Sequence, residues 1–492
     1  MLATKALRRL AVRALLAALS GAWMTATAQA QVPPPGTQPG QIERQFQAPP
    51  QPRSQSGSFS LPVPAQTVEE GWVRLQVIEG YVAEVRIEGD APGALLQAYA
   101  ERIKAEKPLT AATLERCLLL MNDLPGGFAR ALLAPSSSQA GASDLSVQFT
   151  SQRGGGGISI DNRGGRALGP LRGTLDLEQR GLLGWGDRTA VRLVGAEDGE
   201  MTYFSLAHDQ ALGQDGTRIG ASFSRVRSRP DTGTSFIPLD LETESDSAAF
   251  TLSHPLKRSR SENLYVRGAL TGHNGETLLF GVRDTADRIR AFRLGFTYDL
   301  ADAWRGVNIV DVELSRGYEG AGSSRAGDPF LSRTSGQPAF TKLGLYAARL
   351  QPVAQGWSLL AAFSGQVAFD DLLAPELFSF GGEQFGRGYD PSELVGDHGA
   401  ALKLEVRYTL PPFAGWNAGA TVYGFYDAGM VRQRSPGGLD ARQSATSAGL
   451  GVRYEIARFV TGYVEYAKPL SRIVAAEGNR DGRGFAGLSL RY

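Results

Sequence analysis

The sequence predicts a transmembrane β-barrel of about 16 antiparallel strands, preceded by one small α/β domain. Three observations favour this fold class. The chain begins with an export signal, residues 154–492 alternate apolar and polar side chains without a clear helical period, and the last alternating segment ends on an aromatic residue. The same alternation also occurs in soluble all-β domains, where the charged faces meet bulk water, and that alternative stays open at this point.

The first 30 residues have the pattern of a secretory signal peptide. An apolar run at residues 14–22 is too short to span a membrane, and Ala28-Gln29-Ala30 is a small-residue cleavage site. The positive residues ahead of the run are Lys5, Arg8, Arg9 and Arg13. Removing these four positive charges lowers the formal charge from +1 to −3. A mildly acidic chain argues against nucleic acid as a partner.

Composition excludes a helical membrane protein. Of the 492 residues 42% are hydrophobic, and the chain has 61 Gly and 26 Pro. Beyond the signal, no stretch approaches the roughly 20 apolar residues that a spanning helix needs. Residues 31–60 form a Pro/Gln-rich linker that is expected to be extended or disordered. Within this linker, residues 41–46 are interpreted as a short helix.

Residues 61–152 are predicted to form the α/β domain. Alternating segments at 72–78 and 81–88 flank the turn at Glu79-Gly80 and are followed by helical patterns at 94–105 and 110–123. Thr110 is the expected N-cap of the second helix, and Leu124-Pro125-Gly126 ends it. Two further strands are expected at 129–133 and 144–150. The single cysteine, Cys117, cannot form an internal disulfide and is expected to be buried as a small apolar residue.

Residues 153–492 are predicted to form the barrel. Alternating segments occur at 171–177, 189–194, 292–298 and 402–408, and the last of these places Lys403, Glu405 and Arg407 on one face. The glycine run at 154–157 lacks the following Lys-Ser/Thr of a phosphate-binding loop, and we interpret it as a hinge. The final residues, including Gly487, Leu490 and Tyr492, alternate and end on an aromatic side chain, as expected for a strand that closes a barrel.

Residues 372–399 form an unusually long connection between two late strands, and long loops tend to be functional. It contains Phe385-Gly386-Arg387-Gly388-Tyr389-Asp390-Pro391, whose glycines suit a folded hairpin. In a nearby strand, Phe425, Asp427 and Gly429 share one face, with Gly429 leaving room for an approaching loop. An ion pair between Arg387 and Asp427 inside the barrel follows from this arrangement, as one among several Arg–Asp choices.

Taken in order, these segments resemble the transporter component of two-partner secretion systems, the hemolysin activation/secretion family of the POTRA-plus-barrel superfamily. Residues 77–82 and 114–126, with Tyr81 among them, resemble a POTRA domain, and residues 158–164 resemble the entry into the barrel. The segment Gly386-Arg387-Gly388-Tyr389 resembles the motif of the inward-folding sixth loop. Phe425, Asp427 and Gly429 match the family's Phe-x-Asp-x-Gly motif, whose Asp pairs with the loop arginine.

The resemblance implies an outer-membrane pore of a Gram-negative bacterium, with the POTRA domain in the periplasm. An unfolded secreted partner would bind that domain and leave through the lumen, with Arg387–Asp427 as a latch or as a merely stabilising pair. Outer-membrane lipid and the barrel assembly machinery are further implied partners, and residues 41–46 correspond to a plug helix. The chain departs from the family in having one POTRA domain rather than two, and Gly386 where the family prefers Val or Ile, which is expected to weaken loop anchoring.

Other function classes fit less well. The four histidines show no metal-ligand spacing and no nucleophile motif, so neither an enzyme nor a cofactor is expected; they are His208, His254, His273 and His398. A passive porin would leave the α/β domain without a role. A factor that inserts other outer-membrane proteins belongs to the same superfamily and is the main alternative.

Overall fold

The computed structural model describes residues 80–89, 93–139, 141–184, 186–231, 240–411, 419–434, 440–457 and 459–492. The predicted signal peptide, the linker with its short helix at 41–46, the strand at 72–78 and Glu79 lie outside these residues. The described chain divides into two compact units between Ser151 and Gln152.

In its described residues the smaller unit is an α/β domain with a three-stranded sheet. Its elements are β1 (Tyr81–Gly89), α3 (Ala94–Ala105), α4 (Ala111–Asn122), β2 (Gly127–Pro135) and β3 (Ala142–Ser151). The sheet order is β1-β3-β2, with β3 parallel to β1 and antiparallel to β2. The two final strands are longer than expected because their ladder continues past the apolar residues at both ends.

Local signals explain the helices of this domain. The Thr110 side chain accepts a hydrogen bond of 3.2 Å from the Thr113 backbone N–H, which confirms it as the N-cap of α4. Leu124 and Pro125 follow α4, and Gly126 takes a positive φ of 70° that turns the chain into β2. Gly80, ahead of β1, accepts a hydrogen bond from the Leu109 N–H. The core contains the predicted buried Cys117, together with Val82, Leu96, Tyr99, Ile103, Leu120, Met121, Leu145, Val147 and Phe149.

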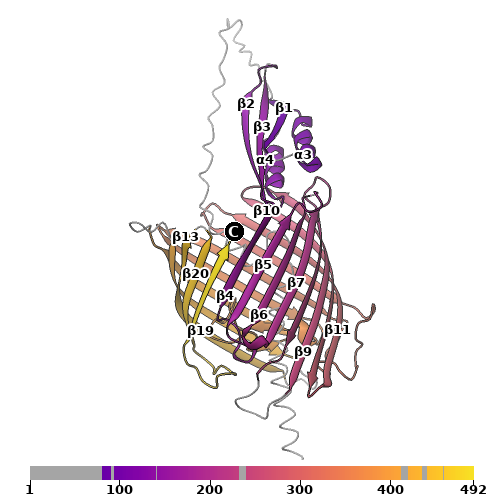
Figure 1. The fold of residues 1–492 in the computed structure, drawn as a ribbon, viewed down its shortest axis with the longest axis vertical. Coiled ribbons are helices and arrows are strands. Elements are labelled where there is room, and N and C mark those ends of the chain that lie inside the picture. The colour runs from indigo at the N-terminus through magenta and orange to yellow at the C-terminus, as the bar shows by residue number, and fades with distance from the viewer. Residues whose placement is uncertain are drawn as a thin grey trace, which may run out of the picture. The chain divides into compact units, whose positions relative to one another are not determined.

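Within the described residues, the larger unit is a closed antiparallel barrel of sixteen strands, which confirms the predicted fold class (Figure 1). Its first eight strands are β4 (Gly154–Asp161), β5 (Arg172–Arg180), β6 (Arg188–Ala196), β7 (Met201–Ala211), β8 (Arg218–Ser228), β9 (Leu241–Arg258), β10 (Glu262–Leu279) and β11 (Val282–Ala301). The others are β12 (Val307–Gly317), β13 (Thr341–Ala354), β14 (Trp357–Ala368), β17 (His398–Thr409), β18 (Ala420–Gln433), β19 (Ala441–Ala457), β20 (Val460–Pro469) and β21 (Arg483–Arg491).

The alternation expected from the sequence sets the two faces of the barrel wall. In β18, Val422, Tyr426 and Met430 are exposed on the outer face, whereas Phe425 and Asp427 are buried on the inner face. This division is typical of transmembrane barrels, in which apolar side chains face lipid and polar side chains line the lumen. None of the helices among the described residues has the length and apolarity required of a membrane-crossing helix.

The barrel closes by pairing its last strand with its first (Figure 1). This contact, which we call the seam, joins β21 to β4 from Gly487 opposite Asp161 to Arg491 opposite Gly157. Leu490 points outward, and the backbone N–H of Tyr492 donates a 3.1 Å hydrogen bond to the Gly156 carbonyl.

The glycine run at 154–157 is not a hinge, which corrects the interpretation from sequence. These residues begin β4 and pair in register with β5. A side chain at Gly157 would place its Cβ 2.9 Å from the Leu490 carbonyl oxygen, and one at Gly156 would approach the Tyr492 ring to 3.0 Å. The glycines are therefore needed where the end of the chain packs closely against the first strand.

Candidate functional site

The long connection between β14 and β17, residues 369–397, folds back against lumen-facing residues of the barrel wall, and we call it the inward loop. It contains a 3₁₀ turn, Ala374–Glu376, and an antiparallel pair of short strands, β15 (Phe378–Phe380) and β16 (Leu394–Gly396). This pair confirms the expected hairpin. The segment between β15 and β16 carries Arg387, whose side chain is fully buried although it belongs to a loop.

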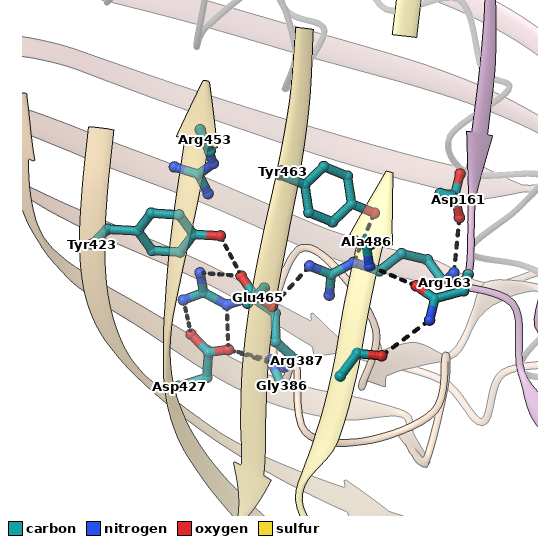
Figure 2. A network of polar contacts seen from close by, with 12 residues as sticks. Asp161, Arg163, Gly386, Arg387, Tyr423, Asp427, Arg453, Tyr463, Glu465 and Ala486 are labelled. Atoms are coloured by element: carbon teal, nitrogen blue, oxygen red, sulfur yellow. Dashed lines mark hydrogen bonds and ion pairs between the residues drawn. The ribbon is translucent and has the colours of Figure 1, made fainter. Parts of the chain in front are cut away.

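Arg387 forms a bidentate ion pair with Asp427 of β18 (Figure 2). Its Nε and Nη2 atoms donate to the two carboxylate oxygens of Asp427 at 2.9 and 2.7 Å. The backbone N–H groups of Gly386 and Arg387 add hydrogen bonds of 3.2 and 3.0 Å to the same carboxylate. Asp427 therefore holds both the side chain and the backbone of the loop tip. Of the Arg–Asp pairings that the sequence left open, the structure brings this one together.

Two further carboxylates surround Arg387, and sequence reasoning assigned neither of them to the site. Nη1 donates to Glu405 of β17 at 2.5 Å and lies 3.7 Å from Glu465 of β20. The guanidinium carbon also lies 3.5 Å from the centre of the Phe425 ring. We call Arg387, Asp427, Glu405 and Glu465 the tip cluster; all four are at most 2% exposed. The available signal was the alternation itself, which placed Glu405 on the polar face of its strand.

Other cations on the wall balance the three acids of the tip cluster. Arg407 pairs with Glu405 at 2.7 Å, and Arg453 lies 3.3 Å from the same carboxylate. Arg163, which follows β4, pairs with Glu465 at 2.8 Å. Burying several carboxylates is costly unless they are paired, so each acid of the tip cluster has at least one guanidinium partner.

The small residues of the loop motif allow its close approach to the wall. Gly386 has a φ of 85°, and a Cβ there would lie 2.7 Å from the Phe380 ring. A Cβ at Gly388 would lie 2.8 Å from the Ser447 Cβ. Valine or isoleucine at position 386 would therefore collide with Phe380, so glycine here allows this packing and need not weaken the anchoring.

Phe380 also fills the space beside Gly429, and Tyr389 anchors the other side of the loop tip. A Cβ at Gly429 would lie 2.1 Å from the Phe380 ring, so the room left by this glycine is filled by Phe380 and not by Arg387. Tyr389 is buried, and its hydroxyl donates a 3.0 Å hydrogen bond to the Thr446 carbonyl while accepting one from the Arg472 N–H.

The base of the inward loop carries a second set of buried ion pairs. Glu376 is paired with Arg293 of β11 and Lys342 of β13, each at 2.7 Å. Burial alone would raise the pKa of Glu376, but these two cations lower it from 4.5 to about 2. Asp397, at the other end of the loop, forms a two-pronged pair with Arg333 at 2.6 and 3.0 Å. Sequence reasoning identified none of these residues.

The arrangement offers ion pairs and hydrogen bonds that hold the loop against the wall. Among the described residues, no group of His, Cys, Asp and Glu is placed to hold a metal ion. The Glu, Asp and Arg side chains of the site neutralise one another in ion pairs. The geometry provides a buried contact between a loop and a barrel wall.

Comparisons with known proteins agree with this fold. Heme/hemopexin transporter protein HuxB of Haemophilus influenzae (strain 86-028NP) is 20% identical over 421 residues, which cover 83% of this chain and 73% of that protein. CdiB from Escherichia coli has a TM-score of 0.73 at 19% identity, covering 84% of this chain and 77% of that structure. BamA from Haemophilus ducreyi lacking POTRA domains 1–3 has a TM-score of 0.53 at 14% identity, covering 84% of each chain.

A protein-family model also matches this chain. The model for haemolysin secretion/activation protein ShlB/FhaC/HecB matches residues 141–454, which include most of the barrel, the inward loop and Asp427. The match spans well over half of the chain, and the family consists of outer-membrane β-barrel transporters of two-partner secretion. The chain therefore belongs to the haemolysin secretion/activation protein family ShlB/FhaC/HecB.

Proposed function

We propose that this protein exports an unfolded secreted partner protein through its barrel lumen and across the outer membrane. The observation that carries the proposal is the inward loop, whose tip is held inside the barrel by a buried ion pair between Arg387 and Asp427. A loop fixed in the lumen by a few polar contacts can leave it and clear a path. Family membership and the transporter name of the relative HuxB support the same reading.

In this scheme the α/β domain is a POTRA domain that lies in the periplasm and receives the partner. Among the described strands β2 lies at one edge of the sheet, and its side chains Phe128 and Leu132 are 60% and 70% exposed. An extended segment that adds to such an edge gains main-chain hydrogen bonds, and alternate side chains provide specificity. Tyr81 begins the strand at the opposite edge, β1.

The tip cluster acts as the latch of this pore. Removing one member of a buried ion pair costs roughly 3–5 kcal/mol, because the remaining charge is left without its partner. Release of Arg387 would let the inward loop leave the lumen when the partner enters. Folding of the partner outside the cell would then bias its movement, so that no nucleotide is needed.

The proposal also covers how the pore is inserted into the outer membrane. Apolar side chains on the outer face contact outer-membrane lipid, and the C-terminal residues Gly487, Leu490 and Tyr492 are the signal that the barrel assembly machinery reads. In the folded barrel Gly487 makes room for Tyr463, since a Cβ there would lie 2.4 Å from the Tyr463 ring.

The test compares proteins in the medium and in the outer membrane of three strains. One lacks the gene, one carries the native gene, and one carries Arg387→Ala. We expect one large secreted protein to disappear from the medium of the deletion strain and to be reduced with Arg387→Ala, while the outer membrane is unchanged. Depletion of many barrels would instead favour an assembly factor, and no change in either fraction would refute export.

A further inference from the structure

The seam is the shortest ladder in the stretch of wall around it. It has five residue pairs, against eight in β4–β5 and eight in β20–β21. Beyond Asp161, the Asn162 backbone N–H still donates a 3.2 Å hydrogen bond to the Ala486 carbonyl, and side chains add further contacts. Asn162 accepts a 2.7 Å hydrogen bond from the Ala486 N–H and donates one of 3.0 Å to the Gly484 carbonyl. This end of the seam is therefore held by side-chain contacts together with a single backbone hydrogen bond.

Arg163 makes the most extensive of these side-chain contacts. Its guanidinium group donates to Glu465 at 2.8 Å and to the Tyr463 hydroxyl at 3.2 Å. The same group lies 4.4 Å from the centre of the Phe485 ring on β21. Arg163 thus connects the end of the first strand to both β20 and β21, across the seam (Figure 2).

Glu465 is shared between the seam and the inward loop. Its Oε1 atom accepts from Arg163, whereas its Oε2 atom accepts from the Tyr423 hydroxyl at 2.8 Å and lies 3.7 Å from Nη1 of Arg387. The carboxylate is only 2% exposed, so its charge is poorly screened by water. Glu465 thus has a hydrogen-bonded arginine on one oxygen and, on the other, a tyrosine hydroxyl with a second arginine at ion-pair distance, and both arginines contribute to its position.

We propose that Glu465 couples the inward loop to the seam, so that a seated loop tip strengthens the β4–β21 contact and its release weakens it. This inference rests on the proposed role of Arg387 as a releasable latch. When Arg387 leaves, water enters the tip cluster and weakens the remaining Arg163–Glu465 pair. The five-pair ladder then opens more often, and Glu465 is the positioning residue that transmits the change.

The test is hydrogen exchange of backbone amides in the purified full-length chain in detergent micelles, without any partner protein. Amide exchange reports local opening, so the seam segments 157–161 and 487–491 are compared with the β9–β10 ladder. The variants are Arg387→Ala, Glu465→Gln and both together. Arg218→Ala is the matched control, because it removes a buried arginine that pairs with Asp209 at a distance from the seam.

We expect Arg387→Ala to speed seam exchange by about tenfold, as for residues coupled in one network, with the β9–β10 ladder unchanged. In the Glu465→Gln background the same substitution should add little, and Arg218→Ala should leave the seam unchanged. The coupling is refuted if Arg387→Ala leaves the seam unchanged, or acts with equal force in the Glu465→Gln background.

If the Glu465→Gln variant does not assemble, the Arg163→Lys variant is used as the background instead. Lysine keeps the positive charge but loses the paired hydrogen bonds to Glu465 and Tyr463 and the stacking on Phe485. The effect of Arg387→Ala should again shrink in that background, and an undiminished effect overturns the coupling. The exchange experiment contains no partner protein, so it tests the coupling separately from export. If the seam responds to Arg387→Ala but the strain comparison shows no export, the proposed function is refuted and the coupling stands.

Discussion

The tip and the base of the inward loop are both held by buried ion pairs, but the charges are distributed in opposite ways. At the tip the loop supplies the cation, Arg387, and the wall supplies the acids Asp427 and Glu405. At the base the loop supplies the acids, Glu376 and Asp397, and the surrounding structure supplies the cations. A loop with this inverted arrangement fits the lumen in one orientation only, because a shifted loop would bring like charges together.

The two ends also differ in how many hydrogen-bond donors each carboxylate keeps when its arginine is lost. Asp397 accepts backbone N–H groups from Leu372 and Arg434 at 2.8 and 2.9 Å, in addition to Arg333. Asp427 accepts from Arg387 and from the backbone of the same loop tip. The acid at the base thus keeps donors from two other segments when its arginine is lost. All the donors described for the acid at the tip leave together with the loop.

The largest effect is expected from Asp427→Ala. This substitution removes the acceptor of four hydrogen bonds and leaves Arg387 buried with too few partners, at a cost of roughly 3–5 kcal/mol to loop seating. Maleimide labelling of Ser392→Cys, in a Cys117→Ala background, measures release because Ser392 is 1% exposed. Labelling should become much faster. Asp246→Ala, which removes the partner of Arg225 on another part of the wall, is the control.

A smaller effect is expected from Arg333→Ala at the base. Asp397 keeps its two backbone donors, so the cost is about 2 kcal/mol. Exchange of the Leu372 amide should rise, while labelling of Ser392→Cys stays slow. If that labelling rises as far as it does with Asp427→Ala, tip and base form a single unit and the comparison fails.

Gly386→Val tests whether the residue that the wider family prefers suits this loop. Its positive φ and the contact with Phe380 predict a cost of about 1–2 kcal/mol. The same labelling assay at position 392 measures it. Adding Phe380→Leu should restore part of the loss by removing the collision, and a Gly386→Val variant that labels as slowly as the parent would contradict the packing described above.

A pH dependence of loop seating is expected as well. Burial, together with Asp390, raises the pKa of Glu393 from 4.5 to about 7, although the Ala475 N–H and nearby arginines oppose this. The seated loop keeps a proton that the released loop loses, so seating weakens as pH rises from about 4.5 to about 7 and changes little beyond. Limited proteolysis of the loop should be faster at pH 8 than at pH 5.5. Glu393→Gln should remove that difference.

Much of the fold could be predicted from sequence because lipid and lumen impose opposite demands on alternate side chains. The segment 402–408 lies within β17, and 292–298 lies within β11, as the alternation indicated. The glycine run at 154–157 was misread because glycine signals both hinges and close strand contacts. Only the position of the chain end beside Gly156 separates the two cases.

The sequence by itself determined which side chains face the lumen, and it identified Arg387 and Asp427 as one candidate pair among several. Only the tertiary structure decided that Glu405 and Glu465 join them, that Phe380 fills the space at Gly429, and that Glu465 also meets Arg163. These residues come from segments far apart in the chain. Their meeting depends on the register in which the barrel closes, since a slip of one residue would turn Glu405 and Glu465 to the outer face of the wall.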